Sequence, residues 1–532
     1  MIDVTGNFAR RQFILSGAVW ASVVLGLAAC GSNLRKSDDD GPVEVAVEAG
    51  RIRGTTETGV GVFRGIPYAA APTGDLRFKA PVPARAWQGV RDANRFGPMP
   101  PAGDPQRNEP SLDVGITNGG DEWLTLNVWT TNAGGSRPDL PVLVWIHGGG
   151  YTTGTSADAR YNGAALAKRG VVVVTCNYRV GVEGFAQISG APANRGLLDQ
   201  IEVLRWVRDN ISVFGGDPGN VTIFGQSAGA GSIACLLTSP LARGLYRRAI
   251  AESVPGDLFS GALAEEIGGA IAQQLGVRPS IEELARFAPA ALAEAARSTR
   301  RDQWGARAVM TTGFAPVIDS VSLPESPWRA LARGVARDVP LIVGHTQHEY
   351  NSQILQKGGF GAVSATDVDE VLGLVPGGAD AYRRGYPELD DAHLYEVASS
   401  DLIFRMPSLH LAQAHTGAGG TTYLYEFLYN TKGAGSGHMA ELPLVFGTVE
   451  SSAAGVALYG KPAPDSALSL AEEIQSRWVS FARGGDPGWP AYTPAEKLTR
   501  NFDAASSTGR YRETVSDDIW NGTNFDPIVI ES

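Results

Sequence analysis

The stretch Val221-Thr222-Ile223-Phe224-Gly225-Gln226-Ser227-Ala228-Gly229 decides the fold of this chain. Its first four residues are apolar or β-branched and predict a buried strand, and the apolar spacing after Gly229 predicts a helix. Residues 225–229 have the form G-x-S-x-G. Between a strand and a helix, this form is typical of a nucleophile elbow, a sharp turn that presents a serine hydroxyl. Ser227 is therefore the candidate nucleophile, and the alternative is a glycine-rich turn without a catalytic role.

Strand-like runs alternate with helical patterns around this turn. Residues 142–146, 171–175, 221–224 and 341–343 are apolar on both faces, as in the buried strands of a parallel sheet. Residues 196–211 space their apolar side chains along one helical face. This rhythm predicts an α/β fold with a large, mostly parallel central β-sheet and helices on both faces. Residues 262–298 and 366–405 are predicted to be helical insertions.

A second motif supplies groups that could stabilise negative charge. The run Ile146-His147-Gly148-Gly149-Gly150 follows a predicted strand, and its glycines leave backbone N–H groups uncovered. This is the HGGG type of oxyanion loop. The predicted oxyanion donors are the N–H groups of Gly149, Gly150 and Ala228. His147 is interpreted as a residue that shapes the loop, because the motif uses its histidine in that way.

The order of many dispersed motifs resembles the type-B carboxylesterases, the cholinesterase-like group of α/β-hydrolases. The resemblance extends from about residue 43 to residue 492. It includes Val62-Phe63-Arg64-Gly65-Ile66-Pro67-Tyr68, Asn177-Tyr178-Arg179-Val180-Gly181 and Phe214-Gly215-Gly216-Asp217-Pro218-Gly219. It implies an α/β-hydrolase fold and the hydrolysis of carboxylic esters through an acyl-serine intermediate. It implies no cofactor and no metal.

The resemblance also places the partners of Ser227. Glu349 takes the acid position of a V-G-x-N-x-D-E-G segment, which reads Val343-Gly344-His345-Thr346-Gln347-His348-Glu349-Tyr350 here. His438 precedes Met439-Ala440-Glu441-Leu442-Pro443, like the family's histidine. The chain order Ser227, Glu349, His438 is the one expected of α/β-hydrolases. As an alternative, His345, His348 and Glu349 would bind a metal, although one short loop offers only three ligands.

Other positions depart from the family or match it more loosely. Gln226 stands where the family commonly has Glu before the nucleophile, and Trp123 replaces a cysteine that forms a disulfide in many relatives. Ser253 matches a family serine near the triad, with either a supporting or a purely structural role. Cys176 and Cys235 lie in apolar runs and are interpreted as buried thiols. The sequence leaves open whether these two cysteines pair.

The composition limits the possible partners. The 532 residues include 45 Lys and Arg against 56 Asp and Glu, for a net charge of −11. No basic surface is available to neutralise phosphates, which argues against a nucleic-acid partner. The expected partner is a small-molecule ester substrate. The oligomeric state and the acyl and alcohol preferences are not determined by the sequence.

The first thirty residues have the pattern of an export signal. Arg10-Arg11 precedes an apolar stretch that reaches Leu27-Ala28-Ala29-Cys30, and this resembles a twin-arginine lipoprotein signal. Residues 31–42 read as a flexible tether, and residues 43–532 as a single α/β-hydrolase domain. We therefore expect lipidation at Cys30, export to the bacterial cell envelope and membrane contact only through that lipid. A plain N-terminal membrane anchor is the alternative, but the apolar stretch is shorter than the roughly 20 residues of a bilayer span.

Two other functions are compatible with the sequence. A noncatalytic adhesion protein is one, since some cholinesterase-like relatives have that role; such relatives typically lose a triad residue, and this chain keeps all three. A hydrolase of amides, thioesters or lactones is the other, because the same triad attacks each of these carbonyl groups. The fold does not decide between these substrates.

Overall fold

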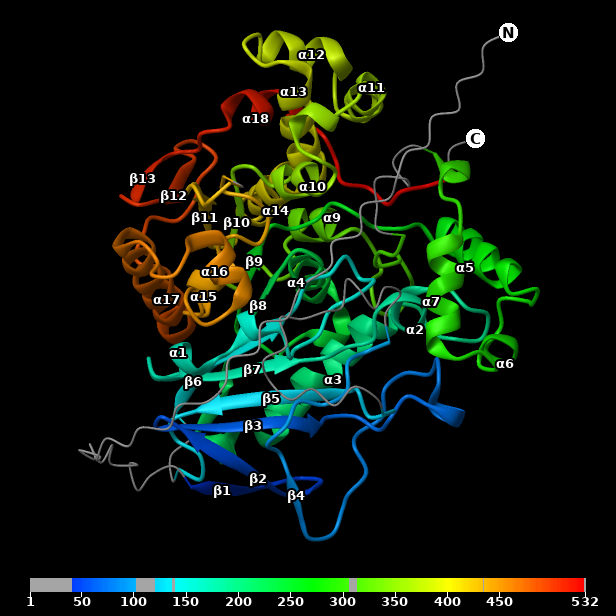
Figure 1. Ribbon diagram of the computed structural model, residues 1–532, viewed down its shortest axis with the longest axis vertical. Helices are drawn as coiled ribbons and strands as arrows, with labels where there is room; N and C mark the ends of the chain where they lie inside the picture. Colours follow the sequence, from blue (N-terminus) through cyan, green and yellow to red (C-terminus); the bar gives the residue numbers. More distant parts are fainter. Residues whose placement is uncertain (1–40, 102–119, 136–138, 306–312, 434, 531–532) are drawn as a thin grey trace, which may run out of the picture. The chain divides into compact units, whose positions relative to one another are not determined.

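A thirteen-stranded sheet runs through the residues that the computed structural model describes, which are 41–101, 120–135, 139–305, 313–433 and 435–530 (Figure 1). Seven neighbouring strands are parallel, as expected. In spatial order they are β7 (Val172–Cys176), β6 (Leu140–Ile146), β8 (Gly216–Gln226), β9 (Arg248–Glu252), β10 (Leu341–Thr346), β11 (Thr422–Phe427) and β12 (Leu498–Phe502).

The two margins of the sheet are antiparallel. One margin consists of β1 (Pro42–Val47), β2 (Gly50–Glu57), β3 (Val60–Pro67) and β5 (Thr125–Thr130), and the other is β13 (Ser507–Arg510). The short strand β4 (Val90–Asp92) pairs with β2 in parallel. The predicted mostly parallel sheet is therefore confirmed for its central part.

Each face of the sheet buries its own apolar layer. Side chains alternate along β6, so that Val144 joins one core cluster and Trp145 joins the other. Leu204 of α3 (Arg195–Asn210), Ile233 of α4 (Ala228–Thr238) and Leu409 of α14 (Met406–Gly417) belong to the first cluster. Trp478 of α17 (Asp465–Gly484) belongs to the second. Helices thus cover both faces, which is why the central strands are apolar throughout.

The helical insertions also form as predicted. The first contains α5 (Gly261–Gln274), α6 (Ile281–Leu284) and α7 (Pro289–Ser298). The second contains α11 (Ala365–Leu374), α12 (Gly378–Gly385), α13 (Asp391–Ser400) and the π-helix η7 (Asp401–Arg405). The remaining α-helices are α1 (Ala164–Ala167), α2 (Gly181–Phe185), α9 (Pro327–Ala332), α10 (Asn351–Gln356), α15 (Leu442–Val445), α16 (Ala453–Tyr459) and α18 (Thr514–Trp520).

The N-terminal expectations lie outside the described residues. Contacts divide the chain into Met1–Asp38 and Asp39–Ser532, and every described residue belongs to the second unit. Arg10, Arg11, Cys30 and nearly all of the predicted tether precede residue 41. Within the described ranges, every helix is too short or too polar to span a bilayer.

Candidate active site

Ser227 occupies a sharp turn between β8 and α4. Its backbone has φ +57° and ψ −127°, a left-handed conformation that a non-glycine residue rarely adopts. The flanking glycines make the turn possible: a Cβ on Gly225 would lie 2.7 Å from the carbonyl oxygen of Ile146, and one on Gly229 only 2.0 Å from it. The Ser227 N–H donates to the carbonyl of Glu252 at 2.9 Å. The predicted elbow therefore has the geometry that its motif requires.

The glycine loop after β6 packs directly on this turn. A Cβ on Gly148 would lie 3.0 Å from Cβ of Ser227, so a larger residue does not fit there. Gly149 and Gly150 have φ values of +118° and +59°, which favour glycine. Ala228 is the first residue of α4, so its N–H has no partner within the helix. The predicted oxyanion donors thus lie on two segments that meet at Ser227.

His147 is placed as a loop-shaping residue. Its side chain is fully buried, its ring stacks on Tyr178 with centroids 4.4 Å apart, and Nδ1 lies 2.8 Å from the carbonyl oxygen of Gly148. Burial lowers the pKa of His147 to about 4, so the ring is neutral near pH 7. Its contacts fix the loop from inside the core, in agreement with the sequence interpretation.

The structure brings Glu349 and His438 together. Nδ1 of His438 donates to Oε2 of Glu349 at 2.6 Å, although the two residues are 89 positions apart. Glu349 follows β10, and the loop that carries it is tied to the histidine loop by a backbone bridge. In that bridge the N–H of His348 donates to the carbonyl of Ser436 at 3.1 Å. His348 and Tyr350 stand where the family segment has Asp and Gly, and Glu349 between them still contacts His438.

The carboxylate of Glu349 is fully buried and has further donors. Oε1 accepts from the Ser253 hydroxyl at 2.6 Å and from the Thr346 N–H at 2.8 Å. Burial by itself would raise the pKa of Glu349, but the charge and hydrogen bond of His438, together with the Ser253 and Thr346 donors, lower it. Glu349 is thus ionised at neutral pH. Ser253 has the supporting contact that the sequence left open.

Two further residues hold the imidazole of His438. The ring of Phe404, on the π-helix η7, stacks on it with centroids 4.2 Å apart. On Gln226, Nε2 lies 3.1 Å from Nε2 and 3.3 Å from Nδ1 of His438. The hydrogen bonds of the described residues do not include one between Ser227 Oγ and His438. Sequence reasoning missed Phe404, because no motif marks it and the π-helix has no sequence signal.

The alternative metal site does not assemble. Both ring nitrogens of His345 are engaged, Nδ1 with the carbonyl oxygen of Thr346 and Nε2 with the hydroxyl of Tyr511, each at 2.9 Å. Nδ1 of His348 lies 3.1 Å from Ser436 Oγ. Over the residues with assigned positions, no group of three or more His, Cys, Asp or Glu side chains is arranged to hold a metal ion.

Both cysteines beyond Cys30 are free and buried. Burial raises the pKa of the Cys176 thiol to about 12 and that of Cys235 further still. Neither thiol ionises appreciably at neutral pH, so both behave as the buried thiols expected from the sequence.

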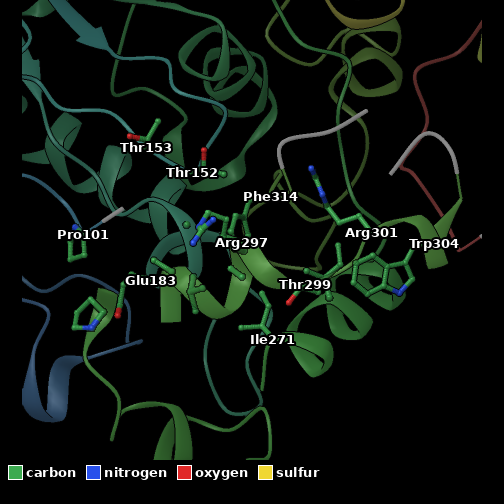
Figure 2. Close-up of a pocket in the computed structure, with 17 residues that line it drawn as sticks. Pro101, Thr152, Thr153, Glu183, Ile271, Arg297, Thr299, Arg301, Trp304 and Phe314 are labelled. Carbon is green, nitrogen blue, oxygen red and sulfur yellow. The ribbon is translucent and has the colours of Figure 1, made fainter. Parts of the chain in front are cut away.

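A pocket of about 390 Å³ adjoins the glycine loop (Figure 2). Thr152 and Thr153 form part of its wall, and their N–H groups donate to the carbonyl of Gly149 at 3.1 Å. The inserted helices supply the apolar residues Ile267, Ile271, Pro289, Ala293 and Ala296, and Trp304 and Phe314 add aromatic surface. The charged residues Glu183, Arg297 and Arg301 also line the pocket. Trp145 and Tyr151, which flank the glycine loop in the sequence, are not among the lining residues and are buried in the core.

Comparison with known proteins identifies the family of this chain. Residues 41–369 and 388–520 match the family described as the Carboxylesterase family. The chain is 34% identical over 482 residues to the para-nitrobenzyl esterase of Bacillus subtilis (strain 168), covering 86% of this chain and 94% of that protein. It is 33% identical over 492 residues to the fumonisin B1 esterase of Sphingopyxis macrogoltabida, covering 85% of each.

Solved structures give the same result. A PNB esterase superposes with a TM-score of 0.79 at 33% identity, covering 90% of this chain and 99% of that one. The carboxylesterase of Geobacillus stearothermophilus superposes with a TM-score of 0.78 at 34% identity, covering 90% and 100%. The fold is that of α/β-hydrolase esterases. The chain therefore belongs to the carboxylesterase family and is a carboxylic-ester hydrolase of the serine type.

Proposed function

We propose that Ser227, Glu349 and His438 form the catalytic triad and that the reaction passes through an acyl-Ser227 intermediate. The observation that carries this proposal is the 2.6 Å contact between His438 Nδ1 and the buried carboxylate of Glu349. It lies beside a serine held at positive φ at the start of a helix. Since Nδ1 donates to Glu349, Nε2 has the free lone pair that a general base needs.

The proposed reaction has two halves. As Ser227 Oγ attacks the ester carbonyl carbon, His438 Nε2 accepts its proton, and the ionised Glu349 stabilises the resulting imidazolium. The N–H groups of Gly149, Gly150 and Ala228 stabilise the oxyanion. The imidazolium then protonates the leaving alcohol oxygen. In the second half, His438 takes a proton from a water molecule as its oxygen attacks the acyl carbon. The imidazolium then returns the proton to Ser227 Oγ as the bond between Oγ and the acyl carbon breaks, and the carboxylic acid is released.

This mechanism requires Ser227 Oγ to come within hydrogen-bond reach of His438 Nε2 when substrate binds. Catalytic hydrogen bonds commonly tighten only in the substrate complex. A change of the serine χ1 rotamer moves the hydroxyl without moving the elbow, because the backbone is fixed by Gly225, Gly229 and the bond to Glu252. The scaffold is thus rigid where the mechanism needs a fixed nucleophile.

The first test replaces the nucleophile or the base. Ser227→Ala and His438→Ala should each reduce kcat on a p-nitrophenyl ester by about 10⁶, because either change removes the activated alkoxide. The variants should still fold, which thermal unfolding checks. An organophosphonate should label the wild-type chain at Ser227 and should not label Ser227→Ala. Full esterase activity in Ser227→Ala would contradict the proposed mechanism.

We also propose that the pocket in Figure 2 receives one arm of the ester. It adjoins the loop that carries two of the proposed oxyanion donors, and the apolar side chains of the inserted helices in its wall favour a bulky group with a large apolar part. A panel of esters with graded acyl and alcohol sizes tests this: kcat/KM should rise with size on one side of the ester bond. An equal response on both sides would assign the pocket no role in selection.

For the N-terminal residues we propose export with a lipid at Cys30. The support is the sequence itself, an arginine pair, a short apolar run and Leu27-Ala28-Ala29-Cys30. In a bacterial host, wild-type chain should sediment with membranes, and Cys30→Ser should move to the soluble fraction while keeping its esterase activity. Unchanged fractionation of Cys30→Ser would contradict lipidation.

A further inference from the structure

The contact between Gln226 and His438 is a contact with the face of the ring. Gln226 Nε2 is nearly equidistant from both ring nitrogens, at 3.1 and 3.3 Å. An atom in the ring plane at those two distances would lie against Cε1, well inside van der Waals contact. The amide nitrogen therefore lies above the plane, where an N–H interacts with the π-face and not with a lone pair.

Phe404 and Gln226 hold the imidazole between them. The Phe404 ring is nearly parallel to it, with an interplanar angle of 25° and centroids 4.2 Å apart. A flat ring with an aromatic partner stacked on it and an amide nitrogen above its plane cannot rotate about χ2 without losing both contacts. Glu349 then fixes the edge that carries Nδ1. The three residues together set the direction of Nε2.

The side chain of Gln226 has little freedom of its own. Gln226 is 1% exposed and ends β8, directly before the nucleophile. A Cβ on Gly148 would lie 3.3 Å from Gln226 Oε1, so the amide oxygen lies against the glycine loop. The amide is therefore held between that loop and the imidazole, with its nitrogen on the side of the ring.

The partial charge of the Gln226 amide determines which charge state of the His438 ring it favours. The N–H end of an amide carries partial positive charge, which disfavours a cationic ring and favours a neutral one. A carboxylate at the same point would do the opposite. The other ionisable groups near His438 are the ionised Glu349, the buried Glu252 and Glu441, whose pKa values are raised, His348 on the acid loop, and Arg405, which is paired with Asp401.

We propose that Gln226 is a positioning residue, which holds the imidazole of His438 against Phe404 and keeps it unprotonated by presenting an uncharged amide to its face. The consequence is an esterase whose base works at lower pH than it would with a carboxylate at this position. The inference rests on the proposed role of His438 as the general base.

The test is the pH profile of kcat/KM for Gln226→Glu. A carboxylate above the ring stabilises the imidazolium, so the acid limb should move to higher pH by about one unit or more. At pH values below the acid limb, kcat/KM of the variant should be about tenfold lower than that of wild type. The pH-independent maximum of kcat/KM should change only a few-fold. Gln274→Glu, on an exposed position of α5, adds the same charge elsewhere and should leave the limb unmoved.

A second variant, Gln226→Met, provides the test if Gln226→Glu folds poorly. Gln226→Met keeps the bulk but removes the N–H, so the limb should move in the same direction by a smaller amount. An unmoved limb in the folded variants would overturn the role of Gln226, and a limb that moves equally in Gln274→Glu would overturn it too. Both results leave the proposed triad unaffected, because failure of the role of His438 as general base would show separately as full activity in His438→Ala.

Discussion

At the scale of single residues, the site depends on the hydrogen-bond donors that surround the carboxylate of Glu349. Glu349 is fully buried and nevertheless has a lowered pKa, because three donors converge on its two oxygens. Desolvation and hydrogen bonding act in opposite directions here, and the donors prevail. Ser253 supplies one of these donors from the bend that directly follows β9.

Removal of the Ser253 hydroxyl tests this balance. Ser253→Ala should lower kcat about tenfold, since a hydrogen bond to a charged group contributes about 1.5–3 kcal/mol and part of it supports the proposed triad. Ser253 also has φ +57°, so Ser253→Gly serves as the control that removes the hydroxyl without backbone strain. Both variants should lose activity equally in steady-state assays. Full activity in Ser253→Gly would leave the hydroxyl without a catalytic role.

At the scale of elements, the elbow depends on close packing of α4 against β6. Gly229 is the second residue of that helix, and because it lacks a Cβ, the helix can approach the Ile146 carbonyl. Gly269 is also helical, on α5, but a Cβ there would meet nothing within 4 Å. Both glycines are thus helical, but the space for a Cβ is occupied at Gly229 and open at Gly269.

This pair gives a matched prediction for thermal unfolding. Gly229→Ala should lower the free energy of unfolding by about 3 kcal/mol or more, because a backbone carbonyl cannot rotate out of the way as a side chain can. Gly269→Ala should raise it by about 0.5–1 kcal/mol, because alanine loses less entropy in a helix. The Tm values measure both changes. An equal Tm for the two variants would mean that Gly229 does not set the helix approach.

At the scale of the whole molecule, burial leaves several carboxyl groups protonated. Burial raises the pKa of Glu252 to about 8, that of Glu396 to about 7 and that of Glu426 to about 8. Glu252 ends β9 and accepts from the Trp478 indole at 2.9 Å, so it joins the sheet to α17. Glu252 and Glu426 are therefore mostly protonated in the folded enzyme at pH 7 and Glu396 is about half protonated, whereas all three are ionised in the unfolded chain.

The sign of the pH dependence follows from this difference. Between the ordinary pKa of 4.5 and about 8, the folded chain holds a proton at Glu252 that the unfolded chain releases. Stability therefore falls as pH rises, by about 1.4 kcal/mol per pH unit for one such group. Glu252→Gln should be more stable than wild type at pH 8 and similar at pH 5 in urea unfolding. The exposed control Glu265→Gln should follow wild type at both pH values.

The sequence by itself determined the sheet, the insertions and the elbow. Apolar periodicity and glycine spacing are local properties, and the segment 221–229 contains strand, turn and helix start in nine residues. The family resemblance added Glu349 and His438, which the structure then joined at 2.6 Å. The fold predictions were confirmed because each rests on residues that are neighbours in the chain, whereas the catalytic roles of Glu349 and His438 stay predictions.

Only the tertiary structure decided how the imidazole is held. Phe404, Gln226 and Ser253 reach His438 or Glu349 from three separate elements, over 34, 212 and 96 positions of sequence. The placement of Trp145 and Tyr151 in the core also followed from packing and not from their position near the glycine loop. Contacts of this kind depend on how the strands and helices pack in three dimensions, and no local pattern in a single sequence encodes that packing.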